Sequence, residues 1–165
     1  KNLTGGLLSF SSSRDTQNRI VNLNDLIVEV LKLLRFELQR KSIEFITEFG
    51  EVPVLTVDPN KIKQVVIDLV MNAAHAMQGQ GKITVTTGIN ATGMLELQVR
   101  DTGPGISPEL QEEVFAPFFT TKPEGEGTGL GLYICQNIIR EHGGTIALES
   151  QLGEGTLFRI SFPVE

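Results

Sequence analysis

Asn72 follows Asp68 by four residues in a stretch with helical periodicity, so the two polar side chains share one helix face. Amide and carboxylate oxygens are the hard ligands that Mg²⁺ prefers, and water and phosphate oxygens usually complete its coordination. We therefore interpret Asn72 as a candidate metal ligand. The alternative is that its side chain makes a polar contact with a neighbouring loop.

Asp101 begins the sequence Asp-Thr-Gly-Pro-Gly-Ile and closes a stretch in which apolar and polar residues alternate. We expect the strand register to point Asp101 away from Leu97 and Val99. A carboxylate here can accept a hydrogen bond from an exocyclic amine, and Gly103 and Gly105 would let a planar ring approach the backbone closely. The alternative is an ordinary Asp–Gly turn.

Glycines also crowd two later segments. Residues 125–132 read Gly-Glu-Gly-Thr-Gly-Leu-Gly-Leu and lead into a predicted helix, where successive backbone N–H groups can bind phosphates. The segment lacks the Lys-Ser/Thr ending of a Walker A loop and the glycine spacing of a Rossmann turn. Gly153, Gly155 and Thr156 lie between two predicted strands. The alternatives are a flexible linker for the first segment and a plain hairpin loop for the second.

These segments fall between the predicted helices and strands of one domain. Asn22 and Asp58-Pro59 are typical helix starts, and glycines near 79–81 and 143–144 are typical helix ends. Periodicity predicts helices over 22–38, 59–78, 107–114 and 128–141, and strands over 43–49, 54–57, 82–89, 94–100, 145–150 and 157–162. Strand pairs joined by tight turns favour antiparallel pairing. We therefore predict a two-layer α/β sandwich, with a mixed, mostly antiparallel sheet covered on one face by three helices.

Composition and charge argue against several classes of function. The chain has 165 residues and a net charge of −6, without a basic patch, which disfavours a nucleic-acid partner. No apolar run approaches the roughly 18 residues of a membrane-spanning helix, and the first residues do not resemble a secretory signal. The single Cys135 suits a reducing compartment. We expect a cytoplasmic domain without membrane contact of its own, whose parent protein another segment could anchor.

In order and spacing, the segments together resemble the ATP-binding catalytic domain of bacterial sensor histidine kinases. That domain belongs to a superfamily shared with gyrase-type topoisomerases, mismatch-repair ATPases and one class of chaperones. The resemblance runs from about Leu23 to Phe162. The stretches that carry it are 68–73 for the family's N box, 101–106, 127–132 and 153–158 for its three glycine boxes, and 115–122 for its F box.

The resemblance implies a Bergerat-type fold that binds ATP and Mg²⁺. Asn72 would hold Mg²⁺ and, with Asp68, form the catalytic pair, while Asp101 would accept from the adenine amino group. Residues 115–126 would form a lid, in which Phe118 and Phe119 are equally well interpreted as core residues. The implied nucleotide-binding residues are Asn72, His75, Asp101, Gly103, Gly105, Ile106, Lys122, Gly127, Thr128, Gly129, Leu130, Gly131, Leu132 and Thr156.

Two positions depart from the family pattern. Asp68 stands where the family usually has asparagine and where the superfamily's ATPases have a glutamate that acts as general base. It could therefore be a base, a helper of Mg²⁺ or a neutral variant. His75 stands where many sensor kinases carry lysine or arginine, so the alternative for it is a plain helix-surface residue.

The implied activity is that of a protein-histidine kinase. Neither His75 nor His142 has the setting of a phosphoacceptor, so the accepting histidine would lie on a dimerisation domain outside this chain. We interpret residues 1–18 as the tail of that domain's helix and a linker, and 19–165 as the ATP-binding domain. A monomeric isolated domain, a homodimeric parent and a downstream response regulator are further expectations. The alternatives are an ATP hydrolase of the same superfamily, a serine-directed protein kinase and a non-catalytic ATP-sensing module.

Overall fold

The computed structural model describes residues 17–119 and 131–164. Four helices and seven strands lie in these two ranges. The helices are α2 (Leu23–Gln39), α3 (Pro59–Ala76), α4 (Pro108–Gln111) and α5 (Gly131–Glu141). The strands are β1 (Arg19–Val21), β2 (Ser42–Phe49), β3 (Leu55–Val57), β4 (Gln80–Ile89), β5 (Leu95–Asp101), β6 (Thr145–Gln151) and β7 (Gly155–Phe162).

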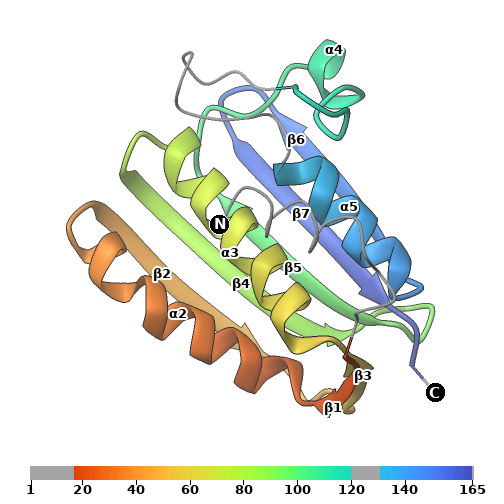
Figure 1. Ribbon diagram of the computed structural model, residues 1–165. Coiled ribbons are helices and arrows are strands. Elements are labelled where there is room, and N and C mark those ends of the chain that lie inside the picture. The colour runs from red at the N-terminus through yellow and green to blue at the C-terminus, as the bar shows by residue number, and fades with distance from the viewer. Residues whose placement is uncertain (1–16, 120–130, 165) are drawn as a thin grey trace, which may run out of the picture.

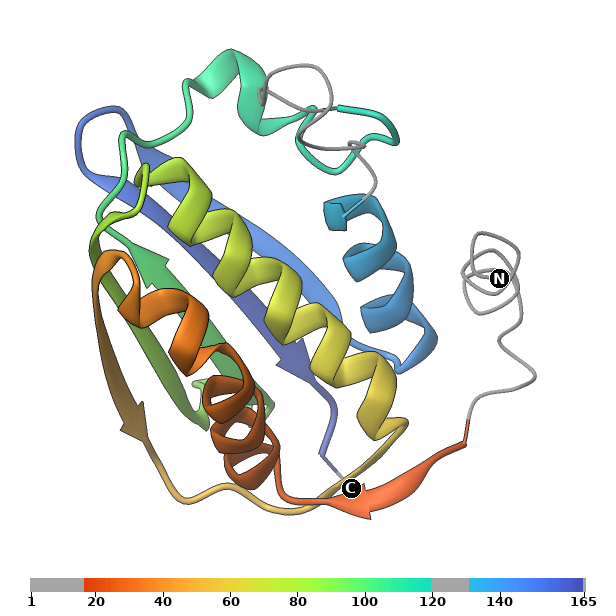
Figure 2. The ribbon, with the colours of Figure 1, turned by 60° about the vertical axis from the view of Figure 1, so that its left-hand side comes forward.

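Five strands form one sheet in the order β2-β4-β5-β7-β6. β2 runs parallel to β4, and the other neighbouring pairs are antiparallel. Helices α2, α3 and α5 lie side by side on one face of this sheet, and the short α4 lies beyond its end (Figures 1 and 2). The predicted two-layer sandwich with three covering helices is therefore confirmed.

Local capping explains where the long helices begin and end. The side chain of Asn22 accepts a hydrogen bond from the backbone N–H of Asp25 at 3.1 Å, and Asp58 does the same for Asn60. Pro59 follows as the first helical residue of α3. At the end of α5, Gly143 adopts a φ of 77°, and the N–H of Gly144 bonds to the Ile139 carbonyl at 2.9 Å.

The core lies between the sheet and the three covering helices. Each of these helices turns one apolar stripe toward the sheet, and strand residues with period-two spacing meet it. Fully buried members of this core are Leu23, Ile27, Leu69, Ile83, Leu95, Leu97, Ile139, Ile160 and Phe162. Among the described residues, no helix is both long enough and apolar enough to cross a membrane.

The first two predicted strands do not form the expected antiparallel pair. β2 pairs in parallel with β4, and β3 instead pairs antiparallel with β1, a short strand that the sequence did not suggest. Parallel strands need a long crossover, which β3 and α3 supply between β2 and β4. Adjacency along the chain is therefore a poor guide to pairing here.

Two other boundaries differ from expectation or lie outside the described ranges. The short helix predicted to reach residue 114 ends at Gln111. Helix α5 is described from Gly131, so its predicted first turn at 128–130 lies outside the described residues, as does most of the predicted N-terminal tail. The domain boundary at residue 19 stays a prediction.

Candidate nucleotide-binding site

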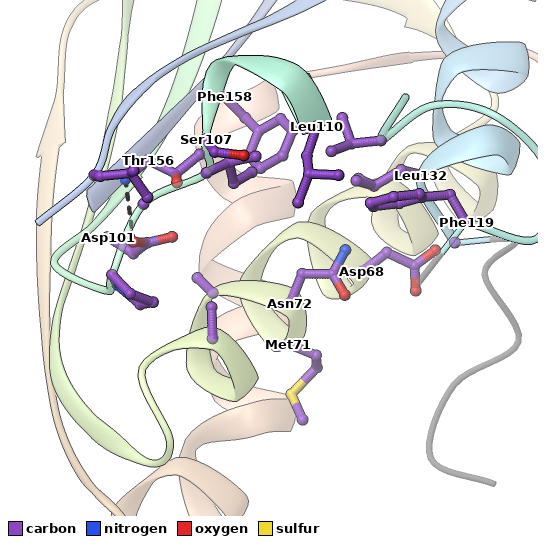
Figure 3. Close-up of a pocket in the computed structure, with 18 of the residues that line it drawn as sticks. Asp68, Met71, Asn72, Asp101, Ser107, Leu110, Phe119, Leu132, Thr156 and Phe158 are labelled. Carbon is purple, nitrogen blue, oxygen red and sulfur yellow. Dashed lines mark hydrogen bonds between the residues drawn. The ribbon is translucent and has the colours of Figure 1, made fainter. Parts of the chain in front are cut away.

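A pocket of about 660 Å³ opens at the end of the sheet where β5 stops, between α3, α4 and the start of α5 (Figure 3). Its volume lies within the ~300–1,000 Å³ that is usual for small-molecule sites. The pocket combines polar and apolar side chains from distant parts of the chain. Its polar members include Asp68, Asn72, Asp101, Ser107 and Thr156, and its apolar members include Met71, Ile106, Leu110, Phe119, Leu132 and Phe158.

Helix α3 contributes Asp68 and Asn72 to one wall of the pocket. The apolar stripe of this helix, which includes Val65, Leu69 and Val70, is buried against the sheet and its neighbours. Asp68 and Asn72 lie beside that stripe, one turn apart, and are half-buried. The burial of the apolar face thus holds two oxygen-bearing side chains at the pocket wall, on one helix face as their spacing predicted.

Asp101 closes β5 and is 4% exposed. Its Oδ1 accepts the backbone N–H of Gly103 at 2.8 Å and that of Thr156 at 3.2 Å. Burial raises the pKa of Asp101 above its ordinary value, while these two hydrogen bonds act in the opposite direction. Since both bonds end on Oδ1, Oδ2 is the carboxylate oxygen left for a ligand in the pocket.

The expected direction of Asp101 was wrong. Asp101 is buried on the same face of β5 as Leu97 and Val99, not on the opposite face. Residues two apart in a strand point to the same side, and this side is the one that the helices cover. The Asp101 carboxylate therefore lies on the side of the sheet where α3 holds Asn72.

The turn after Asp101 is shaped by packing against the β6–β7 hairpin. Gly105 adopts a φ of 82°, and a Cβ there would collide with the carbonyl oxygen of Gln151. The N–H of Gly153 bonds to the Pro104 carbonyl at 2.7 Å, and the N–H of Ile106 bonds to Ser150 Oγ at 2.7 Å. Gly105 does line the pocket, but the requirement for glycine comes from the hairpin behind it.

The hairpin glycine Gly155 has a similar role next to Asp101. Its φ is 98°, and a Cβ would collide with the carbonyl oxygen of Asp101. The next residue, Thr156, is buried, and its Oγ1 lies 2.9 Å from Ser150 Oγ. The last glycine segment therefore brings the backbone of β7 close enough for Thr156 to support the Asp101 carboxylate.

The other predicted site residues divide into three groups. Ile106, Gly131 and Leu132 line the pocket. Gly103 does not line it but donates to Asp101, and His75 is exposed and does not line it, which agrees with the helix-surface alternative. The predicted residues outside the described ranges are Lys122, Gly127, Thr128, Gly129 and Leu130.

Of the three aromatic residues in the predicted lid, Phe115, Phe118 and Phe119, only Phe119 lines the pocket. Phe118 is 73% exposed with a φ of 70°, so it is not a core residue. Sequence reasoning also missed several apolar lining residues. One of them is Phe158, which the sequence placed in a strand of the core. Its ring lies edge-on to that of Phe115, with the ring centroids 6.2 Å apart. Leu110 lies in the short helix α4, and no signal in the sequence placed it at the pocket.

Comparison with known proteins identifies the family. A family model described as histidine kinase-, DNA gyrase B-, and HSP90-like ATPase matches residues 57–165. The chain belongs to this ATPase family. The match begins at the last residue of β3 and includes every described residue that lines the pocket, so the pocket is part of the family's domain.

Several named relatives of this chain are sensor kinases. The chain is 41% identical over 145 residues to the sensor histidine kinase ZraS of Salmonella typhi, covering 87% of this chain. It spans 31% of the length of that relative. The sequence match therefore covers only one part of that longer protein.

Solved structures in the family share the fold closely. The catalytic domain of histidine kinase ThkA matches with a TM-score of 0.79 and 40% identity, over 89% of this chain and 95% of that domain. ThkA in complex with the response regulator protein TrrA matches with a TM-score of 0.80 at 36% identity, over 98% of this chain and 46% of that one. Full-length ShkA in complex with AMPPNP matches with a TM-score of 0.84 at 25% identity, over 98% of this chain and 35% of that one.

Proposed function

We propose that this chain is the catalytic domain of a two-component sensor histidine kinase. It binds Mg–ATP and transfers the γ-phosphate to a histidine on a dimerisation domain outside the chain. The observation that carries the proposal is the convergence of Asn72 and Asp68 from α3 and Asp101 from β5 on one pocket. These groups suit the two ends of the ligand, a metal-bound triphosphate and a base with an amino group.

The adenine end is assigned to Asp101. Its Oδ1 is occupied by two backbone N–H groups, so Oδ2 can accept from the exocyclic amine of adenine. Guanine presents an oxygen at that place, and two acceptors facing each other in a buried site cost about 1–3 kcal/mol. The pocket should therefore prefer ATP over GTP.

The metal end is assigned to Asn72. Its amide oxygen is a suitable ligand for Mg²⁺, which takes its remaining ligands from water and phosphate. When bound, the ion offsets the negative charge of the phosphates. Asp68, one turn earlier on α3, can accept hydrogen bonds from waters on the ion. Catalysis would then consist of positioning and charge neutralisation, and the group that deprotonates the histidine would belong to the partner domain.

The relatives support the partners proposed for this chain. ThkA is seen with a response regulator and ShkA with an ATP analogue. By analogy, this chain would act within a homodimeric parent that contains a histidine-bearing dimerisation domain and serves a response regulator. The isolated domain would be monomeric and cytoplasmic.

The direct test follows the label from γ-labelled ATP. The chain is incubated with Mg²⁺, alone and with a separate histidine-bearing dimerisation domain. We expect the label to stay on ATP when the chain is alone and to move to an acid-labile bond on the partner when both are present. The Asp101→Asn variant, tested in parallel at an ATP concentration below saturation, should transfer less label to the partner.

The second candidate is ATP hydrolysis with Asp68 as general base, because Asp68 lies at the pocket wall where such a base would act. The same experiment separates the two functions. Free phosphate that appears without the partner and disappears in Asp68→Asn would establish the hydrolase and overturn the kinase proposal.

A further inference from the structure

Helices α3 and α5 lie side by side over the sheet (Figures 1 and 2). Polar contacts join these two helices and the residues next to their ends. Away from the pocket, Lys61 pairs with Glu141 at 3.2 Å. There, His142 Nε2 also accepts the backbone N–H of Asp58 at 3.1 Å. Nearer the pocket, Cys135 of α5 makes a polar contact with Asp68 of α3.

Cys135 lies under the pocket wall and is fully buried. Its Sγ lies 3.7 Å from Asp68 Oδ2 and 4.0 Å from the Val65 carbonyl oxygen. A thiol has one proton to donate, and the carboxylate is both the nearer and the more strongly charged acceptor. Burial raises the pKa of the Cys135 thiol well above its ordinary value, and the Asp68 charge raises it further, so the thiol keeps this proton.

We propose that Cys135 is a positioning residue that holds the Asp68 carboxylate at the pocket wall through a thiol–carboxylate hydrogen bond. In doing so it sets the affinity of the pocket for Mg–ATP. This inference rests on the proposed function, because it concerns what Asp68 does there. Cys135 itself does not line the pocket and would act through Asp68.

The position of Cys135 on α5 gives the contact a second consequence. Gly131 and Leu132, at the start of this helix, line the pocket, and Cys135 lies one turn further along. The hydrogen bond therefore joins the α3 wall to the helix that follows the glycine-rich segment. A carboxylate held in one orientation also loses less conformational freedom when it meets a hydrated metal ion than a freely rotating one would.

The contact itself can be tested without any nucleotide. Because the chain has a single cysteine, its infrared S–H stretching band reports on this residue alone. We expect the band of the wild-type chain to lie at lower frequency than that of Asp68→Ala, because hydrogen bonding weakens the S–H bond. Identical bands in the two proteins would show that the thiol does not donate to Asp68, and the inference would be overturned.

The effect on function is tested by titrating Mg–ATP into wild type, Cys135→Ala and Cys135→Ser. We expect Cys135→Ala to bind about fivefold more weakly, which corresponds to about 1 kcal/mol for one hydrogen bond. Serine keeps a donor at this place, so Cys135→Ser should remain within about twofold of wild type. In an Asp68→Ala background, Cys135→Ala should cause no further loss, because the group through which it acts is gone.

Ile139→Val is the matched control. Ile139 is equally buried on α5 but does not line the pocket, so its truncation loosens packing without touching Asp68. It should leave the dissociation constant of Mg–ATP unchanged, and thermal unfolding confirms that each variant is folded. A Cys135→Ala loss that persists in the Asp68→Ala background, or that Ile139→Val reproduces, would overturn the inference. A wild-type chain that fails to bind Mg–ATP would overturn the proposed function as well, while the S–H band would still decide whether the contact exists.

Discussion

Asp101 Oδ1 accepts the backbone N–H of Thr156 at 3.2 Å, across the antiparallel pairing in which these two residues stand opposite each other (Figure 3). The same oxygen accepts from Gly103, so one carboxylate oxygen is used by the fold and the other faces the proposed base. The last strand of the sheet thus supports the residue that would recognise adenine. Because only Oδ1 is bound by the backbone, replacing the other oxygen by an amide NH₂ group should affect nucleotide binding and the pH dependence of stability.

The Asp101→Asn variant should keep the fold and lose the preference for ATP over GTP. An asparagine can retain Oδ1 as the acceptor for both backbone N–H groups, but it places an NH₂ donor where Oδ2 was. We expect ATP affinity to fall by about 1–3 kcal/mol and GTP affinity to rise relative to it. Dissociation constants for both nucleotides measure the change. A variant that still prefers ATP as strongly as wild type would assign adenine recognition to another group.

The same variant should change how stability depends on pH. The raised pKa of Asp101 means that the folded state binds this proton more tightly than the unfolded state, so the ionised carboxylate costs folding free energy at neutral pH. The neutral amide carries no such cost. The advantage of Asp101→Asn in free energy of unfolding should therefore be largest above the folded pKa. It should shrink as pH falls through that pKa toward the ordinary value of 3.8.

Urea unfolding of both proteins, repeated from neutral pH to about pH 4, measures this difference. A difference in free energy of unfolding that stays constant over the whole range would mean that the Asp101 pKa is not raised in the folded protein.

Asn72→Ala should remove the Mg²⁺-dependent part of ATP binding. The amide oxygen is the proposed protein ligand of the ion, and removal of even an outer-shell partner of a bound metal typically costs about 10–100-fold in affinity. Calorimetric titration of ATP with and without Mg²⁺ measures the effect. Gln64→Ala is the matched control, because Gln64 lies on the same polar stripe of α3 but is exposed and does not line the pocket. Equal ATP affinity in wild type and Asn72→Ala would rule out this role.

Gly155→Ala should destabilise the protein by about 2–3 kcal/mol and weaken ATP binding. The added Cβ would meet the Asp101 carbonyl, and the φ of 98° is unfavourable for any residue with a side chain. β7 would then have to move away from β5 at the point where Thr156 supports Asp101.

Gly88→Ala provides the comparison for this variant. Gly88 also lies in a strand of the main sheet, but a Cβ there meets nothing within 4 Å and its φ is not in the left-handed region. This change should be neutral or slightly stabilising. If thermal unfolding shows similar losses for the two variants, glycine at 155 is not required by the close approach of β5 and β7.

Local sequence signals predicted most of the elements and several of the residues that line the pocket. The caps at Asn22 and Asp58 depend on side chains that reach backbone groups two or three residues away, so the short stretch at the start of each helix is enough to predict them. The spacing of Asp68 and Asn72 on one helix face is equally local. The glycine segments predicted sharp turns because glycine tolerates backbone angles that other residues avoid.

By itself, then, the sequence determined the helices and most of the strands, the covered sheet and the residue types that meet at the pocket. The tertiary structure decided the relationships across long separations. These are the parallel pairing of β2 with β4, the support of Asp101 by Thr156, the outward position of His75 and the contact of Cys135 with Asp68. The physical reason is that pairing and packing between distant segments depend on which apolar faces bury together, and no short stretch of sequence contains that information.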